Sequence, residues 1–302
     1  MDKQNNSPLN QNSIKKIDIK KNALNKSHDK SYDRIAKELL NIANEYCWKI
    51  KDYQKATEYY EKSLNIKPNY INALSDYAQH QRLHTKNYIY AIDLYSKVIE
   101  LNPNFEYAYS RRSFCKQNLK DYNGAIQDLL NYMQINPIVD PHVYISIAII
   151  KFKIEDFKGI IEDCTKAIKL DTKNDCAYSY RGRANFYLKN YNEAIADFKT
   201  AYEIEINKSK SNNEFKPFSL ANLKYYGRAK FEIQEYKNAL RIFEEMIEQY
   251  PKHHYTYELI ANCYEKLNDY TNYKVNFDKF SSLNEIHLKR LEAASLRRKN
   301  EE

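Results

Sequence analysis

His80 and His84 have the spacing of two metal ligands, and no other histidines in the sequence do. Residues four apart lie on one face of a helix, so the two imidazoles could bind one ion. The sequence shows no third ligand beside them. Near a helix end, we therefore expect two solvent-facing polar side chains and no metal.

Motifs of hydrolases and nucleotide-binding enzymes are missing from the sequence, which contains no HExxH, GxxxxGK[ST] or GxSxG. With 4 Gly among 302 residues, a glycine-rich phosphate loop is nearly excluded. Acidic pairs such as Glu244 and Glu245 fall at solvent-facing helical positions. The sequence therefore predicts a non-catalytic protein that needs no cofactor and no metal.

The cysteines and the hydropathy pattern indicate a cellular location. None of the 5 Cys has CxxC spacing and most fall at helix-packing positions, so we interpret them as buried, reduced thiols. No apolar run approaches the length of a membrane span, and the first ten residues lack the apolar core of a secretory signal. These features predict a cytoplasmic, or alternatively nuclear, protein with no membrane association. The cysteines are Cys47, Cys115, Cys164, Cys176 and Cys263.

The elements that carry these residues follow a repeating pattern. An aromatic residue recurs at intervals of 35, 34, 35, 34, 45 and 34 residues. A fixed period in this range indicates a stack of similar units in which each contacts only its neighbours. The recurring residues are Tyr53, Tyr88, Tyr122, Phe157, Tyr191, Tyr236 and Tyr270.

Each recurring aromatic opens a predicted helix with one apolar face. Asp or Asn precedes most of the aromatics and would cap the helix, and Pro follows several of the helices. Apolar residues stand three and seven positions after the aromatic, and a second helix with a small central residue lies upstream. Each unit is therefore predicted to be a hairpin of two helices, which makes the fold all-α. The two apolar sets are Ala56, Ala91, Ala125, Ile160, Ala194, Ala239, Tyr273 and Tyr60, Tyr95, Leu129, Cys164, Phe198, Phe243, Phe277.

This pattern closely resembles the tetratricopeptide repeat (TPR), with the best matches at Tyr178–Tyr202 and Tyr225–Pro251. The resemblance covers roughly 250 residues. It implies a right-handed α-solenoid of about seven TPR hairpins with a C-terminal capping helix. The repeats are predicted at residues 37–70, 71–105, 106–139, 141–174, 175–208, 220–253 and 254–285, within an array over 31–285.

Three segments lie outside the repeats. Residues 1–30 are rich in Lys, Asn and Ser and are predicted to be a disordered tail. Residues 209–219 form an insertion that is expected to be a loop after a lengthened helix. Residues 286–302 are predicted to be a separate helix that covers the exposed face of the last repeat. Its covering residues would be Ile286, Leu288, Leu291 and Leu296.

The resemblance also implies where a partner binds, because the first helix of each TPR hairpin lines a groove. Carried over position by position, it makes the centre of the groove apolar, with aromatic and Arg residues on both sides. Tyr and Arg dominate binding energy at many interfaces. The candidate groove residues are Tyr107, Arg111, Phe114, Ile145, Ile149, Tyr180, Arg183, Tyr187, Tyr225 and Arg228.

These residues suggest the chemistry of the partner. Helix 142–152 is apolar nearly all round, which favours an apolar anchor, and the arginines could pair with carboxylates or phosphates. We therefore expect a protein or peptide partner with an apolar anchor and acidic flanks. The alternative is that Tyr107, Tyr180 and Tyr187 only pack between repeats. The resemblance implies that a TPR protein holds the acidic C-terminus of a heat-shock chaperone with a clamp of Lys, Asn and Arg residues. Such a partner is disfavoured here, because only Arg111 matches the clamp and because Glu45 and Asp76 would repel a carboxylate.

Two other functions remain open. Residues 1–34 carry a net charge of +4 and residues 286–302 carry +2, which leaves +2 of the total +8 for the repeats. A nearly neutral array lacks the basic stripe of a nucleic-acid-binding protein, so an RNA-binding helical-repeat protein is the alternative to a scaffold or adaptor. The second alternative function is that of a regulatory subunit of a larger enzyme complex.

Overall fold

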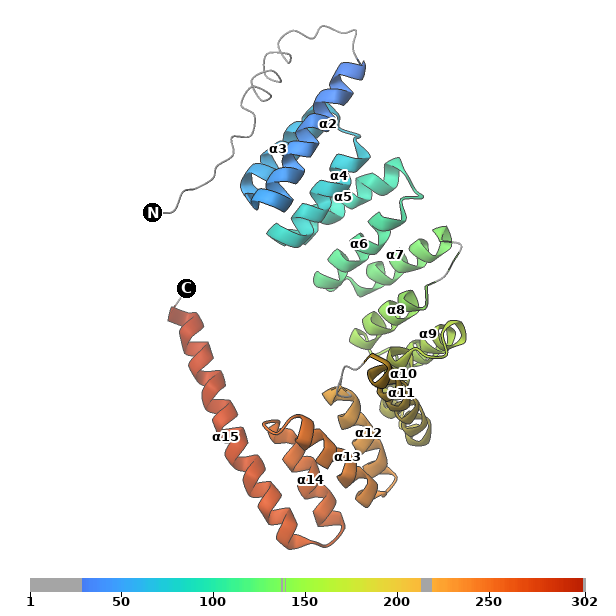
Figure 1. Ribbon diagram of the computed structural model, residues 1–302, viewed down its shortest axis with the longest axis vertical. Helices are drawn as coiled ribbons and strands as arrows, with labels where there is room; N and C mark the ends of the chain where they lie inside the picture. The colour runs from blue at the N-terminus through green and yellow to red at the C-terminus, as the bar shows by residue number, and fades with distance from the viewer. Residues whose placement is uncertain (1–28, 137, 139, 213–218, 301–302) are drawn as a thin grey trace. The chain divides into compact units, whose positions relative to one another are not determined.

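The computed structural model describes residues 29–136, 138, 140–212 and 219–300, in which helices are joined by short turns and no strand occurs (Figure 1). The predicted tail (apart from its last two residues), the centre of the 209–219 insertion and residues 301–302 lie outside the described part. The all-α prediction is confirmed. The chain divides into an N-terminal unit, residues 1–137, and a C-terminal unit, residues 138–302.

The N-terminal unit is a stack of three helical hairpins. Two of its first helices, α2 and α4, end in wider π-helical turns, η1 and η2. Each helix packs against the helices before and after it in the chain. The first helix of a hairpin therefore contacts the second helix of the preceding hairpin. The elements are α2 (Asp29–Glu45), η1 (Tyr46–Ile50), α3 (Tyr53–Ile66), α4 (Ile71–His80), η2 (Gln81–Thr85), α5 (Tyr88–Leu101), α6 (Glu106–Asn118) and α7 (Tyr122–Ile135).

The C-terminal unit continues the same alternation with four hairpins. Its helix α10 contacts α9 and α11 along the chain, and also the first helices α8 and α12 of the hairpins on either side. The elements are α8 (Pro141–Lys153), α9 (Phe157–Leu170), α10 (Asp175–Tyr187), α11 (Tyr191–Asn212), α12 (Leu220–Glu232), α13 (Tyr236–Gln249), α14 (His254–Lys266) and α15 (Tyr270–Asn300). No helix in the described residues is both long and apolar enough to cross a membrane.

The turn inside each hairpin has the same backbone conformation. The side chains of Asp52, Asn87, Asp121 and Asp156 accept hydrogen bonds from the backbone N–H three residues on, which confirms the predicted helix caps. One residue ahead of each cap position, the backbone is left-handed, with φ between 54° and 65°. Glycine is the usual residue in this conformation, yet none stands there. The left-handed residues are Lys51, Lys86, Lys120, Glu155, Lys189, Gln234 and Asn268.

The two periodic apolar sets form the core, as predicted, except in the last hairpin. In the first six hairpins, the residue three positions after the aromatic is 0% exposed. The residue seven positions after it is at most 6% exposed. A small residue faces it from the first helix, as Gly227 faces the ring of Phe243. In the last hairpin, by contrast, Phe277 is 42% exposed.

The predicted capping helix is wrong in one respect. Residues 286–300 continue α15 without a break, so no separate helix folds back over the last repeat. The reason is that residues 281–286 contain neither Gly nor Pro to end the helix. Ile286 is 47% exposed and Leu288 is 51% exposed, so neither covers the last hairpin. The side chains of Leu291 and Leu296 lie outside the described residues. Helix α11 extends to Asn212, so residues 209–212, which were predicted to begin the loop, are helical instead.

Candidate functional site

Arginine and aromatic side chains gather on the first helices α8, α10 and α12 of the C-terminal unit. The guanidinium of Arg183 on α10 lies over three rings, 4.4 Å from the centroid of Phe152, 5.2 Å from that of Tyr180 and 5.3 Å from that of Tyr225. These rings belong to three successive hairpins. Stacking on aromatic rings holds the planar guanidinium in place while its donors stay available.

Tyr187 connects the same hairpins at the end of α10. Its ring stacks on Phe157 at 4.7 Å between centroids, and its hydroxyl is 2.7 Å from that of Tyr225. Burial and the hydrogen bond to Tyr225 raise the pKa of Tyr187, so it remains a neutral phenol. The side chain is nevertheless 43% exposed, so it both joins hairpins and faces outward. We call Phe152, Phe157, Tyr180, Arg183, Tyr187 and Tyr225 the aromatic–arginine cluster.

The arginines of the first helices fall into two kinds. Arg181 makes a two-pronged contact with the carboxylate of Asp197, at 2.7 and 3.0 Å, and Arg112 contacts Asp128 in the same way. Each carboxylate lies on the second helix of the same hairpin, so each arginine holds the two helices of its hairpin together. Arg183 and Arg228, by contrast, form no ion pair within the part of the chain that the structure describes.

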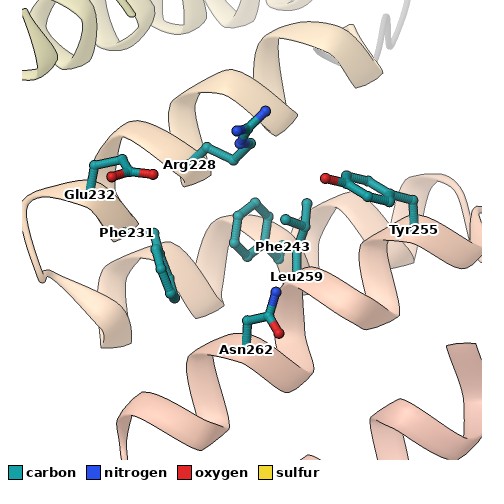
Figure 2. Close-up of a pocket in the computed structure, with 7 residues that line it drawn as sticks. All are labelled: Arg228, Phe231, Glu232, Phe243, Tyr255, Leu259 and Asn262. Atoms are coloured by element: carbon teal, nitrogen blue, oxygen red, sulfur yellow. The ribbon is translucent and has the colours of Figure 1, made fainter. Parts of the chain in front are cut away.

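A pocket of 170 Å³ lies beside Arg228, between α12, α13 and α14 (Figure 2). Phe243 and Leu259 supply apolar surface at 0% and 8% exposure, and polar groups come from Arg228, Glu232 and Asn262. Drug-sized ligands occupy pockets of about 300–1,000 Å³, so this one suits a single side chain better than a cofactor. The remaining lining residues are Phe231 and Tyr255.

The structure corrects one candidate on α8. Ile145 is only 6% exposed and packs in the core with Ala148 and Ile160, so it cannot line an open surface. Ile149 is 37% exposed and remains available. The resemblance assigned both residues to the groove by their positions in the repeat. Because α8 is apolar nearly all round, its sequence does not show which side faces the core.

The candidates on α6 form a smaller group in the N-terminal unit. Arg111 lies 4.5 Å from the ring centroid of Tyr107, whose hydroxyl donates to Gln79 at 2.8 Å. Phe114 is 43% exposed, with the guanidinium of Arg82 5.1 Å from its ring. The same arginine-on-aromatic arrangement therefore occurs in this unit too.

Some residues of the site were missed from the sequence. Phe152, Phe186, Tyr255 and Leu259 were not among the candidates, and Phe157 was interpreted only as a marker of the repeat. Phe186 lies 5.0 Å below the guanidinium of Arg228. The available signal was the placement of aromatics near the end of α8 and α10, close to arginines on the next first helix.

The two histidines are also corrected. His80 is 0% exposed, not solvent-facing, and His84 is half-buried. A third soft donor, Cys47, lies beside them, and the three ligand atoms are all within 4.8 Å of one another. The first helix of the preceding hairpin supplies this cysteine, 33 residues before His80. Because the contact joins two repeats, the residues next to the histidines in the sequence do not reveal it.

Comparison with known proteins identifies the repeat. The tetratricopeptide repeat family matches residues 39–70 in the N-terminal unit and residues 225–253 in the C-terminal unit. A TPR repeat-containing protein of Methanocaldococcus jannaschii is 26% identical over 165 residues, which is 53% of this chain and 26% of that protein. The mitochondrial import receptor subunit TOM70 of Saccharomyces cerevisiae is 35% identical over 75 residues, 25% of this chain and 12% of that protein.

The matched parts thus span about a quarter or less of these relatives. A solved structure of a tetratricopeptide repeat protein from Parabacteroides merdae superposes with a TM-score of 0.57 at 14% identity, over 82% of this chain and 93% of that one. At this identity the likeness concerns the fold. The period, the hairpins with their buried positions and the repeat matches together show that the chain belongs to the tetratricopeptide repeat proteins.

Proposed function

We propose that this chain is a non-catalytic scaffold or adaptor that binds a peptide of a partner protein on the first helices α10, α12 and α14 of its C-terminal unit. TPR proteins are in general protein-interaction scaffolds. The peptide carries one apolar anchor residue and acidic residues beside it.

The contrast between the two kinds of arginine carries this proposal. Arg181 and Arg112 are neutralised by aspartates of the array, whereas Arg183 and Arg228 have no carboxylate partner in the described residues. The two guanidinium groups lie on neighbouring rings, because Arg183 is 5.3 Å from the centroid of Tyr225 and Arg228 is 5.0 Å from that of Phe186. These two rings are 5.3 Å apart between centroids. Two guanidinium groups held on aromatic rings favour binding of carboxylates.

The pocket beside Arg228 supplies the apolar half of the recognition. Its volume suits one side chain, and Phe243 and Leu259 offer that side chain an apolar surface. Burying an apolar side chain there would stabilise the complex by about 1.5–3 kcal/mol. An anchor in this pocket would place the neighbouring peptide residues beside the guanidinium of Arg228. Glu232 also lines the pocket and would repel an acidic residue beside it, so the peptide should be acidic on only one side of its anchor.

The buried thiols support the proposal of a non-catalytic protein as far as thiol chemistry is concerned. Burial raises the pKa of Cys47 and Cys115 to about 11, and those of Cys164 and Cys263 to about 12. A thiol becomes a nucleophile when its pKa is lowered. These four thiols are therefore protonated at neutral pH and poor nucleophiles.

A peptide-display library screened against the full-length chain tests the proposal. Selected peptides are expected to share an apolar residue flanked by Asp or Glu, with binding measured by fluorescence anisotropy. The paired change Arg183→Glu and Arg228→Glu should weaken that binding at least tenfold, roughly the loss of one good interface contact. Arg241→Glu, an exposed charge reversal on the second helix α13, is the matched control and should leave binding unchanged.

The same assay separates the alternatives. Binding of random single-stranded RNA with a steep salt dependence, also lost on reversing both arginines, would favour the RNA-binding function instead. Peptide binding that survives the double reversal would place the partner site elsewhere. Purification from native cells in a stable complex with an enzyme would favour the regulatory subunit.

A further inference from the structure

We propose that Cys47, His80 and His84 form a zinc site in the N-terminal unit, separate from the peptide surface. The cysteine comes from η1 of the first hairpin, and the histidines come from the end of α4 and from η2 of the second. An ion bound there would join two hairpins by their first helices.

The hydrogen bonds around His80 leave one ring nitrogen ready to bind a cation. The hydroxyl of Thr57 donates its only proton to the carbonyl oxygen of Tyr53 at 3.1 Å. It must therefore accept from Nε2–H of His80, 3.0 Å away. Nδ1 of His80 then carries a lone pair, and it lies 3.4 Å from Sγ of Cys47. Metal-binding histidines are commonly oriented in this way by an oxygen on the far side of the ring.

His84 provides an independent observation. Its Nε2 is buried and has no hydrogen-bond partner among the described residues. The ring is held by stacking on Tyr53 at 4.2 Å and by an edge contact with Trp48 at 5.2 Å, both between centroids. A buried ring nitrogen without a partner is costly, and a metal ion would satisfy it.

The distances fit a tetrahedral ion after a small closure. Zn–S bonds of about 2.3 Å and Zn–N bonds of about 2.0–2.1 Å place neighbouring ligand atoms about 3.5 Å apart. Cys47 and His80 already have this separation, while the widest pair of the three donors is within 4.8 Å. His84 sits in a π-helical turn that ends at the left-handed Lys86, and a shift of about 1 Å there would complete three protein ligands, leaving the fourth position to water.

The donor set and the surrounding charge select the ion. One thiolate and two imidazoles suit Zn²⁺ better than Mg²⁺ or Ca²⁺, which prefer oxygen. Binding would release the thiol proton of Cys47 to solvent and form the Zn–S bond, which leaves one positive charge on the site. Asp76 stands one helical turn before His80 on α4, and it accepts a hydrogen bond from the side chain of Asn44 at 2.8 Å. Its carboxylate would balance that charge.

Cobalt titration of the full-length, untagged chain tests the site. The exposed thiol of Cys176 is first changed to Ser in every sample, so that it cannot bind metal. We expect one Co²⁺ per chain, with a thiolate-to-cobalt charge-transfer band and the intense ligand-field bands of a tetrahedral ion, all abolished by one equivalent of Zn²⁺. Far-UV circular dichroism checks that each variant is folded.

Three substitutions and one control locate the ligands. Cys47→Ser should remove the charge-transfer band, and His84→Ala should weaken Zn²⁺ binding by more than the about 10–100-fold that loss of an outer partner costs. Thr57→Val should weaken binding within that range, because it frees the ring of His80. Cys115→Ser, a change of another buried thiol, should have no effect.

The proposal is overturned if the folded chain gives no thiolate band with Co²⁺, or if His84→Ala binds Zn²⁺ as tightly as the unchanged chain. Should Cys47→Ser fail to fold, His84→Ala still decides, since that side chain is only half-buried. A chain that binds Cu⁺ through these ligands and not Zn²⁺ would overturn the assignment of the ion.

Discussion

A methyl group added at Gly227 should destabilise the C-terminal unit, whereas the same change at Gly182 should not. Both glycines lie on first helices where the second helix of the hairpin packs closest. A Cβ at Gly227 would come within 2.3 Å of Cε1 and 2.7 Å of Cζ of Phe243, but a Cβ at Gly182 would remain 3.2 Å from its nearest neighbours. The two sites therefore form a matched pair within one unit.

The magnitude follows from the space available. Carbon atoms pack at about 3.5–4.0 Å, so the ring of Phe243 must retreat by more than about 1 Å. The ring is 0% exposed, so it can retreat only by displacing its neighbours or by filling part of the pocket that it lines. Overpacking of this kind costs about 1–3 kcal/mol, while Gly→Ala in a helix gains about 0.5–1 kcal/mol. A 2.3 Å contact belongs in the upper half of the overpacking range, so Gly227→Ala should lose about 1–2.5 kcal/mol. Gly182→Ala, where neighbours yield a few tenths of an ångström, should be nearly neutral.

Urea denaturation followed by circular dichroism measures both variants against the unchanged chain. If the slope of the unfolding free energy against urea concentration is unchanged, the substitution affects the folded state and not the unfolded state. Gly227→Ala should also weaken peptide binding, because Phe243 lines the pocket. If the Gly227 variant proved as stable as the Gly182 variant, the ring would be free to move and the packing argument would be refuted.

Three further predictions concern stability. Asp197→Ala should cost about 3 kcal/mol or more in urea denaturation, because it leaves the guanidinium of Arg181 without its buried partner; an unaltered midpoint would contradict this. Glu155→Gly should stabilise by about 0.5–1 kcal/mol, because it relieves a left-handed backbone at φ 57°; a loss of stability would show that the turn is unstrained. Burial, then the nearby charges of His254 and Lys224, lower the pKa of His253 below its ordinary 6.5. The unfolded chain therefore binds a proton at His253 more readily than the folded chain does. The free energy of unfolding should fall as the pH drops below about 6.5. His253→Asn should flatten that part of the profile, measured by thermal denaturation across pH.

The repeat could be predicted from sequence because its core is local. The residues three and seven positions after each aromatic face the preceding helix of the same hairpin, so a one-dimensional period identifies them. Ala91 and Tyr95, both 0% exposed, are examples. The same logic failed at residues 281–286, because no local residue ends the helix and only a tertiary contact could have made the chain fold back.

The candidate site was predictable only in part. Residue type and position led to Arg183, Tyr187 and Arg228, because the first helices of such hairpins face one way. Which arginine is neutralised from within was not predictable: Arg181 and Arg183 are two residues apart, but only Arg181 meets an aspartate of the neighbouring helix. That distinction depends on the rotation of α10 between α9, α11 and α12.

What the sequence by itself determined is the helical hairpin, its period, its caps and its buried positions, since each depends on residues within one repeat. Only the tertiary structure decided the pocket beside Arg228 and the burial of Ile145. It also brought Cys47 and His80 together. Cys47 in η1 and Arg82 in η2 each contact a side chain of the next hairpin, His80 and Phe114 respectively. These contacts depend on how the helices pack, so the spacing of residues along the sequence does not predict them.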